Sequence, residues 1–455
     1  MAIAYVSGIF VTAMDMHIVN VALPTLSHEF SAPLADVQWT VIAYLLTLAV
    51  VIPASGWIGD RVGTKRTFLF ALALFTLASA LCGGAQSLGG LIAARALQGV
   101  GGGLMTPTGT AMLYRAYGPE RRAKVARTLI VPILVAPATA PILGGVLTQH
   151  LSWRWVFLVN IPVGLATLLF SHLFLPEHRS DRGGRLDVRG LLLSGVGLSA
   201  LLYAISEGSV LGWTSAPILI SGLGGIGLLT AFARLSLRQA DPILRLRLLR
   251  DRLFRATNIV FALSTGVFLG SLYLTPIFLQ EVMHQSPTES GTTTFVEALG
   301  VGFAAQTLGR LYPRVGPRVM AGFGAAGLCL FLALFVLIDG NTNLWLVRGL
   351  MFFGGIANGA VFLAVQTSMF TTISSEDTGH ASAIYNSQRQ STIALNIAIL
   401  TTVVAGVSGS TVRAFHAAYL TGAILASVGT LCAWTLIRTG DARSTMLPRR
   451  TPTAT

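Results

Sequence analysis

The chain is poor in charged residues and almost free of cysteine. Of its 455 residues, 11% are charged and 53% are hydrophobic, whereas roughly 25% of the residues in a soluble domain are charged. The three cysteines, Cys82, Cys329 and Cys432, all lie in apolar runs, which excludes the disulfide framework of small secreted proteins. The sequence therefore predicts an integral membrane protein with buried thiols.

The chain also lacks the residue clusters that carry enzyme chemistry. Its eight histidines are scattered, and neither a Cys/His pair, a metal-ligand cluster nor a glycine-rich phosphate loop accompanies them. The net charge of +13 would suit nucleic acid, but the basic residues are confined to short loops between apolar runs, a pattern that reflects membrane orientation. We expect no enzymatic activity, no cofactor, no metal and no nucleic-acid partner.

Fourteen apolar runs are long enough to cross a bilayer, for which a helix needs about 20 residues. Each span must be helical, because an open strand edge leaves backbone groups unsatisfied in hydrocarbon. The first run has no basic segment before it and no clear cleavage site, so we interpret it as a retained span and not as a signal peptide. The predicted spans are 3–26, 37–58, 67–86, 88–113, 124–148, 153–175, 188–208, 214–233, 254–282, 288–310, 317–338, 343–370, 379–407 and 413–437.

The basic residues are divided unequally between the two sides of these spans. With fourteen crossings, 26 of the 31 lysines and arginines fall on the side that also holds both termini. Basic loops face the cytoplasm, so we predict cytoplasmic termini and a multi-pass protein of the cytoplasmic (inner) membrane. The basic stretch 234–255 is either a surface helix on anionic lipid headgroups or a plain loop of the same orientation.

A short pattern recurs at an offset of 253 residues and indicates two related halves. Arg95 aligns with Arg348 in the register of the other matches, and parallel halves around a central site are typical of secondary transporters. The other aligned residues are Gly56, Asp60, Arg61, Gly63 and Lys65 with Gly309, Pro313, Arg314, Gly316 and Arg318. The predicted domains are an N-terminal six-helix bundle at 1–178, two inserted transmembrane helices with a basic linker at 179–252, a C-terminal six-helix bundle at 253–440 and a cytoplasmic tail at 441–455.

Two carboxylates and an arginine lie deep within predicted spans. At 1.5 Å per residue, Asp15 is roughly 18 Å from either end of its span and Glu297 about 10 Å inside its own. A lone charge at such depth is costly, so each group must pair, protonate or face the protein interior. We predict Asp15 as the main proton site, Glu297 as a second proton or cation site, and Arg95 as the group that expels the proton. The alternatives are structural: an aspartate held by hydrogen bonds and an arginine that clamps helices together.

His17 lies two residues after Asp15. Two residues turn a helix by about 200°, so we expect the two side chains to point apart.

The stretch from Gly56 to Arg66 is predicted to form a cytoplasmic gate between the second and third spans. Gly56 would allow close helix approach, and Gly63 would allow a tight turn. Asp60 would cap and pair at this face and hold one conformation shut. The remaining residues of this motif are the cations Arg61, Lys65 and Arg66.

Two further sets of residues complete the predicted site. Pro137, Pro141, Gly144 and Gly145 suggest a bent gating helix, because proline kinks a membrane helix and glycine admits a close neighbour. A helix that tolerates prolines without a functional role is the alternative. Candidate cavity residues, which could equally be packing residues, are Asn20, Tyr44, Gln98, Phe268 and Tyr273.

Five stretches together resemble the major facilitator superfamily, and within it the fourteen-span drug:proton antiporter branch (EmrB/QacA-like). They are Met14–Pro24 in the first span, Gly56–Arg66, Arg95–Gly99 in the fourth span, Ala140–Gly145 in the fifth, and Trp153–Pro162. Two positions depart from the family pattern: Pro313 stands where the second-half echo has an aspartate, and Ala140 stands where the antiporter motif has a glycine.

The resemblance implies an all-α major facilitator fold with two six-helix bundles, two inserted helices and a fourteen-span count. It also implies proton-coupled efflux of small lipophilic or cationic drugs by alternating access, with the proton as coupling ion and Arg95 in proton transfer. The alternatives are a dedicated exporter of one endogenous metabolite or lipid, a membrane enzyme, and a sensor or scaffold that does not transport. The expected partners are the small-molecule substrate, protons and anionic lipids. We expect a monomer, and a periplasmic adaptor protein stays an open alternative.

Overall fold

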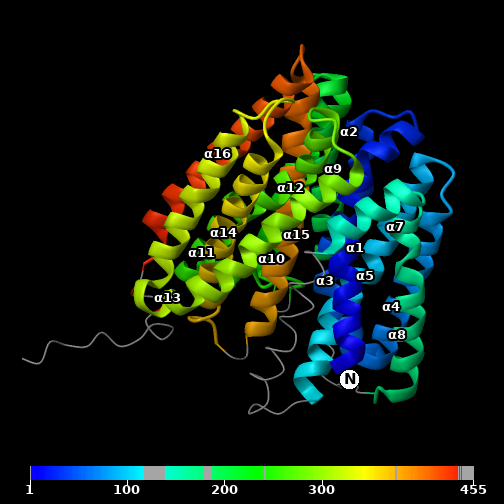
Figure 1. The fold of residues 1–455 in the computed structure, drawn as a ribbon. Coiled ribbons are helices and arrows are strands. Elements are labelled where there is room, and N and C mark those ends of the chain that lie inside the picture. The colour runs from blue at the N-terminus through cyan, green and yellow to red at the C-terminus, as the bar shows by residue number, and fades with distance from the viewer. Residues whose placement is uncertain are drawn as a thin grey trace, which may run out of the picture.

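The computed structural model describes residues 2–116, 139–177, 187–239, 242–374, 377–438, 440 and 442. These residues form helices joined by turns and short loops, and no strand occurs among them (Figure 1). The all-helical architecture follows from the apolar composition, because a helix satisfies its own backbone hydrogen bonds without water.

The helices fall into three consecutive groups along the chain. The first half comprises α1 (Ala2–Glu29), α2 (Leu34–Val37), α3 (Trp39–Val62), α4 (Thr64–Gly83), α5 (Leu88–Ala116), helical residues 139–150, α7 (Trp155–Leu158) and α8 (Asn160–Phe174). The middle group comprises α9 (Val188–Leu211), α10 (Ala216–Arg238) and the short 3₁₀ helix η2 (Leu246–Arg250). The second half comprises α11 (Arg252–Leu263), α12 (Thr265–Glu281), α13 (Pro287–Phe335), α14 (Leu344–Ser368), α15 (Thr378–Gly406) and α16 (Thr411–Leu436).

Nine stretches of the described chain are helical, long and apolar enough to cross a membrane. One of them, α13, has 49 residues and consists of two helical segments that meet at Gly316, where φ is 80°. At 1.5 Å per residue an unbroken helix of this length would measure about 74 Å, far more than the roughly 30 Å hydrocarbon core. The break lies where the sequence predicts a turn between two spans. The count of fourteen crossings stays a prediction.

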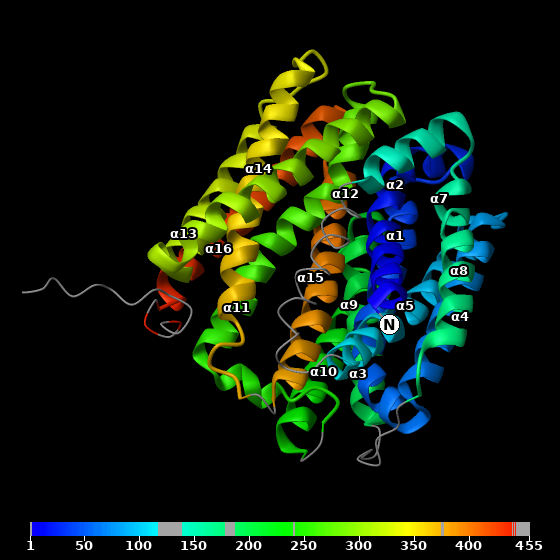
Figure 2. The same ribbon diagram turned by 60° about the horizontal axis from the view of Figure 1, so that its bottom comes forward.

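The two halves stand side by side, and the middle helices lie against both of them. In Figures 1 and 2 the first half occupies one side and α11, α13, α14 and α16 occupy the other. Within the halves, α3 and α4 pack on α5, and α13 packs on α14 and α16. Between the halves, α15 packs on α3 and α1 packs on α12, while α9 contacts both α3 and α15.

Local sequence signals account for several helix starts. Ser286 and Glu289 form a reciprocal capping box at the start of α13, in which each side chain accepts from the other residue's backbone N–H. Asp187 caps α9 by accepting from the N–H of Gly190, and Asp251 caps α11 by accepting from Phe254. These caps fix where the helices after each loop begin.

The outer faces of the helices are apolar. On α10, Ile220 is 73% exposed and Leu223 is 69% exposed, which suits a surface in contact with lipid and not with water. Polar side chains are instead buried inside the molecule, among them Asp15, Arg95 and Glu297. This distribution is the reverse of that in soluble proteins. The candidate functional groups therefore lie in the interior of the molecule.

Candidate functional site

Asp15 is the centre of a buried polar network inside the first half. Its Oδ2 lies 2.6 Å from Nη1 of Arg95, and both side chains are fully buried. Its other oxygen, Oδ1, accepts hydrogen bonds from the amide of Gln98 at 2.9 Å and from the amide of Asn160 at 2.8 Å. The four residues come from α1, α5 and α8, so three helices of the first half meet at one carboxylate.

Arg95 is held by partners on several sides. Its Nε donates to the backbone carbonyl of Thr40 at 2.9 Å, and its Nη1 also donates to Oε1 of Gln98 at 2.6 Å. The guanidinium carbon lies 4.2 Å from the centroid of the Tyr44 ring, where the ring face attracts a cation. Removing one partner of a buried ion pair typically costs about 3–5 kcal/mol. The network is therefore both a possible switch and a structural element of the first half.

Small residues bring the helices of this network together. A Cβ on Gly99 of α5 would overlap the backbone carbonyl of Tyr44, and a Cβ on Gly164 of α8 would overlap the side chain of Thr76. Close approach of backbones at glycine is the usual way in which membrane helices pack. Gln98 follows Arg95 by three residues, so both side chains leave the same face of α5.

Glu297 lies in the first segment of α13, and its carboxylate has no partner among the described residues. The side chain is 8% exposed, and no described residue donates a hydrogen bond to it or forms an ion pair with it. Neighbouring hydroxyl groups satisfy themselves within the helix, as when Thr294 donates to the carbonyl of Ser290 at 3.0 Å. Asp15 and Glu297 are thus buried acids of opposite kinds: one has three donors, and the other has none among the described residues.

The predicted cavity residues divide into three groups. Tyr44 and Gln98 belong to the Asp15 network. Phe268 packs in the core of the second half, with its ring 5.6 Å from that of Phe331. Asn20 and Tyr273 are buried, and each has a side-chain oxygen without a hydrogen-bond partner among the described residues.

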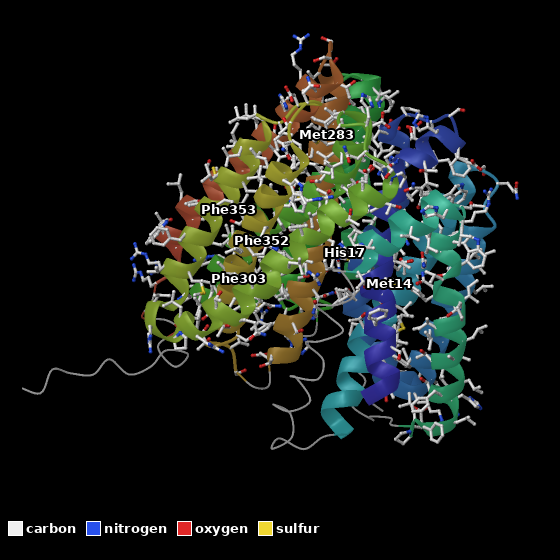
Figure 3. All side chains as sticks on the ribbon, in the orientation of Figure 1. Met14, His17, Met283, Phe303, Phe352 and Phe353 are labelled. Atoms are coloured by element: carbon white, nitrogen blue, oxygen red, sulfur yellow. The ribbon has the colours of Figure 1, made fainter. Side chains whose placement is uncertain are left out.

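His17 points away from the network that contains Asp15. In Figure 3 it lies on the side of α1 toward the second half, whereas Asp15 is bonded to α5 and α8. Figure 3 also shows Phe303 and Phe352 on the second half, far from α1. Phe303 is 52% exposed, so this aromatic pair belongs to the outer surface.

The predicted gate motif forms the tight junction between α3 and α4. Gly63 has φ 108°, a conformation that favours glycine. The carboxylate of Glu177 accepts from the backbone N–H of Lys65 at 3.0 Å and of Arg66 at 3.3 Å, so it caps the first turn of α4. The Nζ of Lys65 donates to the carbonyl of His172 at 2.8 Å. The turn is therefore tied to the end of α8.

Glu177 was missed by the sequence analysis. Glu177 follows the sixth predicted span, 153–175, on the side that holds the Gly56–Arg66 stretch, but nothing in the sequence pairs the two segments. Asn160 lies in the Trp153–Pro162 stretch, but the sequence indicated no role for it. In the structure its amide donates to Asp15.

The structure bears on the expectation for Gly56 in the gate motif but not on the one for Asp60. Gly56 is exposed, and a Cβ there would meet no atom of the described residues within 4 Å, so the described part of the chain shows no close helix approach at this residue. Arg61 is exposed in the last turn of α3. Asp60 lies in the same turn, but its side chain is outside the described part of the chain, so its gating role stays a prediction.

The second-half echo reproduces the turn but not the acidic cap. Gly316 has a positive φ of 80°, as Gly63 has at the corresponding position. The helix after it begins with Pro317, which has no N–H to be capped. Gly309, like Gly56, has open space around it. Among the described residues, a carboxylate therefore caps the helix that follows the turn at Gly63, and none caps the helix that follows the turn at Gly316.

The described part of the predicted gating helix, residues 139–150, packs against both halves. A Cβ on Gly144 would lie 2.7 Å from the carbonyl oxygen of Ile18 in α1. A Cβ on Gly145 would overlap the carbonyl of Pro287 in α13, and a Cβ on Gly291 of α13 would overlap the carbonyl of Pro141. Helix 139–150 and α13 therefore each have a glycine against which the backbone of the other packs closely. Pro137 lies outside the described residues.

Contacts between the halves gather at the end of the molecule where α2 lies, opposite the N-terminus (Figure 1). Gln280 of α12 donates to the carbonyl of Val21 at 3.0 Å, and the backbone N–H of Thr288 donates to Gln149 at 3.2 Å. An ion pair of 3.8 Å between His28 and Glu281 lies at the same end. The halves are thus joined at the α2 end.

Comparisons with known proteins agree with this architecture. The family model of the Major Facilitator Superfamily matches residues 5–396 and 258–452. The chain is 38% identical over 325 residues to a multidrug resistance protein B homolog of Mycobacterium tuberculosis, a match that covers 70% of this chain and 60% of that protein. The match thus spans less than two thirds of the relative's length. It is 32% identical over 405 residues to the multidrug resistance protein Stp of the same species, covering 88% and 74% of the two chains.

Further matches extend to another genus and to solved structures. A putative multidrug resistance protein MdtD of Serratia proteamaculans is 32% identical over 361 residues and covers 79% of this chain and 75% of that one. A crystal structure of the peptide transporter POT has a TM-score of 0.70 at 16% identity, over 98% and 95% of the chains. The human organic anion transporter MFSD10 has a TM-score of 0.62 at 15% identity, over 95% and 98%. The fold is that of these transporters, and the chain belongs to the major facilitator superfamily.

Proposed function

We propose that the chain exports small lipophilic or cationic drugs in exchange for protons, by alternating access between its two halves. The names of the multidrug resistance relatives support drugs as the cargo. The observation that carries the proposal is the buried Asp15 carboxylate, which reaches three helices through Arg95, Gln98 and Asn160. A protonation event at such a group changes contacts on all three helices at once.

Asp15 is the proposed proton site, and its geometry defines what loading requires. Oδ2 accepts from Arg95, and Oδ1 accepts from two amides. A proton on Oδ2 would face the N–H of Arg95, so the guanidinium has to withdraw before the proton binds. Return of Arg95 then displaces the proton. Helix motion that shifts α5 against α1 would couple these two steps to the opening of either end.

The energy available from the proton is sufficient to bias such a motion. Each proton that moves down a 100 mV potential supplies about 2.3 kcal/mol. Cargo and proton must bind the two conformations unequally, because a ligand that binds both equally shifts nothing. Glu297 is the proposed second proton or cation site, since its buried carboxylate has no partner among the described residues.

We further propose fourteen spans with both termini in the cytoplasm, as in the EmrB/QacA-like branch. The distribution of 26 of 31 basic residues to one side supports this orientation. The α2 end of the molecule, where the halves are joined, is then extracellular. Under this proposal, the structure is a state in which the outer end is shut.

The test uses the purified full chain in liposomes with an imposed pH gradient and rhodamine 123 as the cationic probe. The wild-type protein should accumulate the dye against its gradient. Asp15→Asn should lose this accumulation but retain exchange of labelled for unlabelled dye, which shows that it is folded. Asp36→Asn, a change in the short helix α2, is the matched control and should behave like the wild type. Gradient-driven accumulation that is unchanged in Asp15→Asn would refute the proton role of Asp15.

A further inference from the structure

Arg389 is a deep arginine that the proposed proton path does not use. It lies eleven residues into α15, about 16 Å along the helix, and its side chain is half-buried. Its Nε is buried without a hydrogen-bond acceptor, and no described carboxylate forms an ion pair with it. An unpaired guanidinium at membrane depth is costly and needs an anionic partner.

The unpartnered polar atoms near Arg389 on α15 are the hydroxyl of Tyr385 and the amide oxygens of Gln388 and Gln390. Tyr385, one turn earlier on α15, is 4% exposed, and its hydroxyl has no partner among the described residues. In Figure 3, His17 lies on the side of α1 toward the second half. The ring of Phe261, 5.3 Å from that of Tyr385, adds an apolar wall.

The buried acids of the molecule do not neutralise this group. Asp15 is saturated by Arg95, Gln98 and Asn160 within the first half. Glu297, on α13, has no ion pair with Arg389. The other deep arginine of the second half, Arg348, has partners of its own: it donates to Thr293 at 3.4 Å and lies 4.8 Å from the Trp345 ring. Arg389 is thus a cationic site without an internal counter-charge among the described residues.

We propose that Arg389, with Tyr385, binds a carboxylate group of the cargo. The substrate range then includes amphiphilic organic acids and zwitterions, with the acidic group on α15 and the apolar part against Phe261. This inference rests on the proposed function, because it takes this face of α15 as part of the cargo path. A hydrogen bond to a charged group contributes about 1.5–3 kcal/mol, which corresponds to roughly tenfold or more in affinity.

The experiment compares two dyes that differ in one group. Rhodamine 110 has a free carboxylate, and rhodamine 123 is its methyl ester. Binding of each to the purified full chain in detergent is measured by fluorescence polarisation, for the wild type, Arg389→Gln, Arg389→Lys and the control Arg413→Gln. Each titration is repeated with added phosphatidylglycerol, because a lipid phosphate could occupy the same site.

The wild type should bind the acid more tightly than the ester. Arg389→Gln should lower this preference about tenfold, with binding of the ester unchanged, and Arg389→Lys should restore part of it. Arg413→Gln should resemble the wild type. The proposal is overturned if the wild type does not prefer the acid, if Arg389→Gln weakens both dyes equally, or if phosphatidylglycerol abolishes the preference. Because binding is measured without a gradient, failure of proton-driven transport would refute the proposed function and leave this result standing.

Discussion

Replacing Asp15 with asparagine should reveal how strongly the buried network stabilises the first half. Asparagine has nearly the same shape, so the change is electrostatic. Its Oδ1 still accepts from Gln98 and Asn160, as the carboxylate does. Its amide group then faces Nη1 of Arg95, which now lies 2.6 Å from Oδ2. Two hydrogen-bond donors, the asparagine amide and Nη1 of Arg95, would then face each other, whereas the wild type has a donor and an acceptor there.

The expected loss in the free energy of unfolding follows from the groups that lose a partner. Arg95 retains the carbonyl of Thr40 and the amide oxygen of Gln98, but its charge is left uncompensated in a fully buried position. Breaking one side of a buried ion pair costs about 3–5 kcal/mol. A double variant, Asp15→Asn with Arg95→Gln, removes the charge and lets the new amide oxygen accept from asparagine. It should recover at least half of the loss.

The assay is thermal unfolding of the purified protein in detergent, followed by tryptophan fluorescence. Asp15→Asn should lower the midpoint clearly, and the double variant should lie between it and the wild type. Equal midpoints for Asp15→Asn and the wild type, or strictly additive losses in the double variant, would refute the reasoning. Non-additivity is the signature of two groups that contact each other.

The remaining predictions concern other parts of the site. Glu297→Gln should change the free energy of unfolding by no more than about 0.5 kcal/mol, because no described residue bonds to that carboxylate, yet it should alter the pH dependence of dye transport; a large loss of stability would point to a structural role. Gly145→Ala should lower the free energy of unfolding by about 1–3 kcal/mol by overpacking against Pro287. Gly302→Ala, which meets no atom within 4 Å, is its control, and equal effects of the two would contradict the packing argument. Glu177→Gln should weaken the cap of α4 by about 0.5–2 kcal/mol and slow transport; an unchanged transport rate would show that the cap has no part in gating.

The sequence predicted individual residues better than their partners. Asp15, Arg95 and Glu297 stood out because a charge within an apolar run is conspicuous. That Asp15 pairs with Arg95 and Glu297 with no described residue depends on how helices 80 or more residues apart pack, which periodicity does not encode. The turn at Gly316 was predictable from its register with Gly63.

Other residues show where sequence reasoning reached its limit. Phe268 was a candidate cavity residue but is core, because an aromatic side chain in a span looks the same in either role. Gly56 suggested close packing, yet open space surrounds it. Glu177 was missed because a cap from a distant segment leaves no local pattern. The role of Arg389 depends on the absence of a described carboxylate that pairs with it. That absence can be seen only when the packing of all the helices is known.

Proton release on cargo binding tests the central claim most directly. The purified full chain in weakly buffered detergent is mixed with rhodamine 123 near neutral pH, and an indicator dye reports the protons released. The account predicts release by the wild type and its loss in Asp15→Asn under conditions in which both bind the dye. Binding by the wild type without proton release, or equal release by Asp15→Asn, would contradict it.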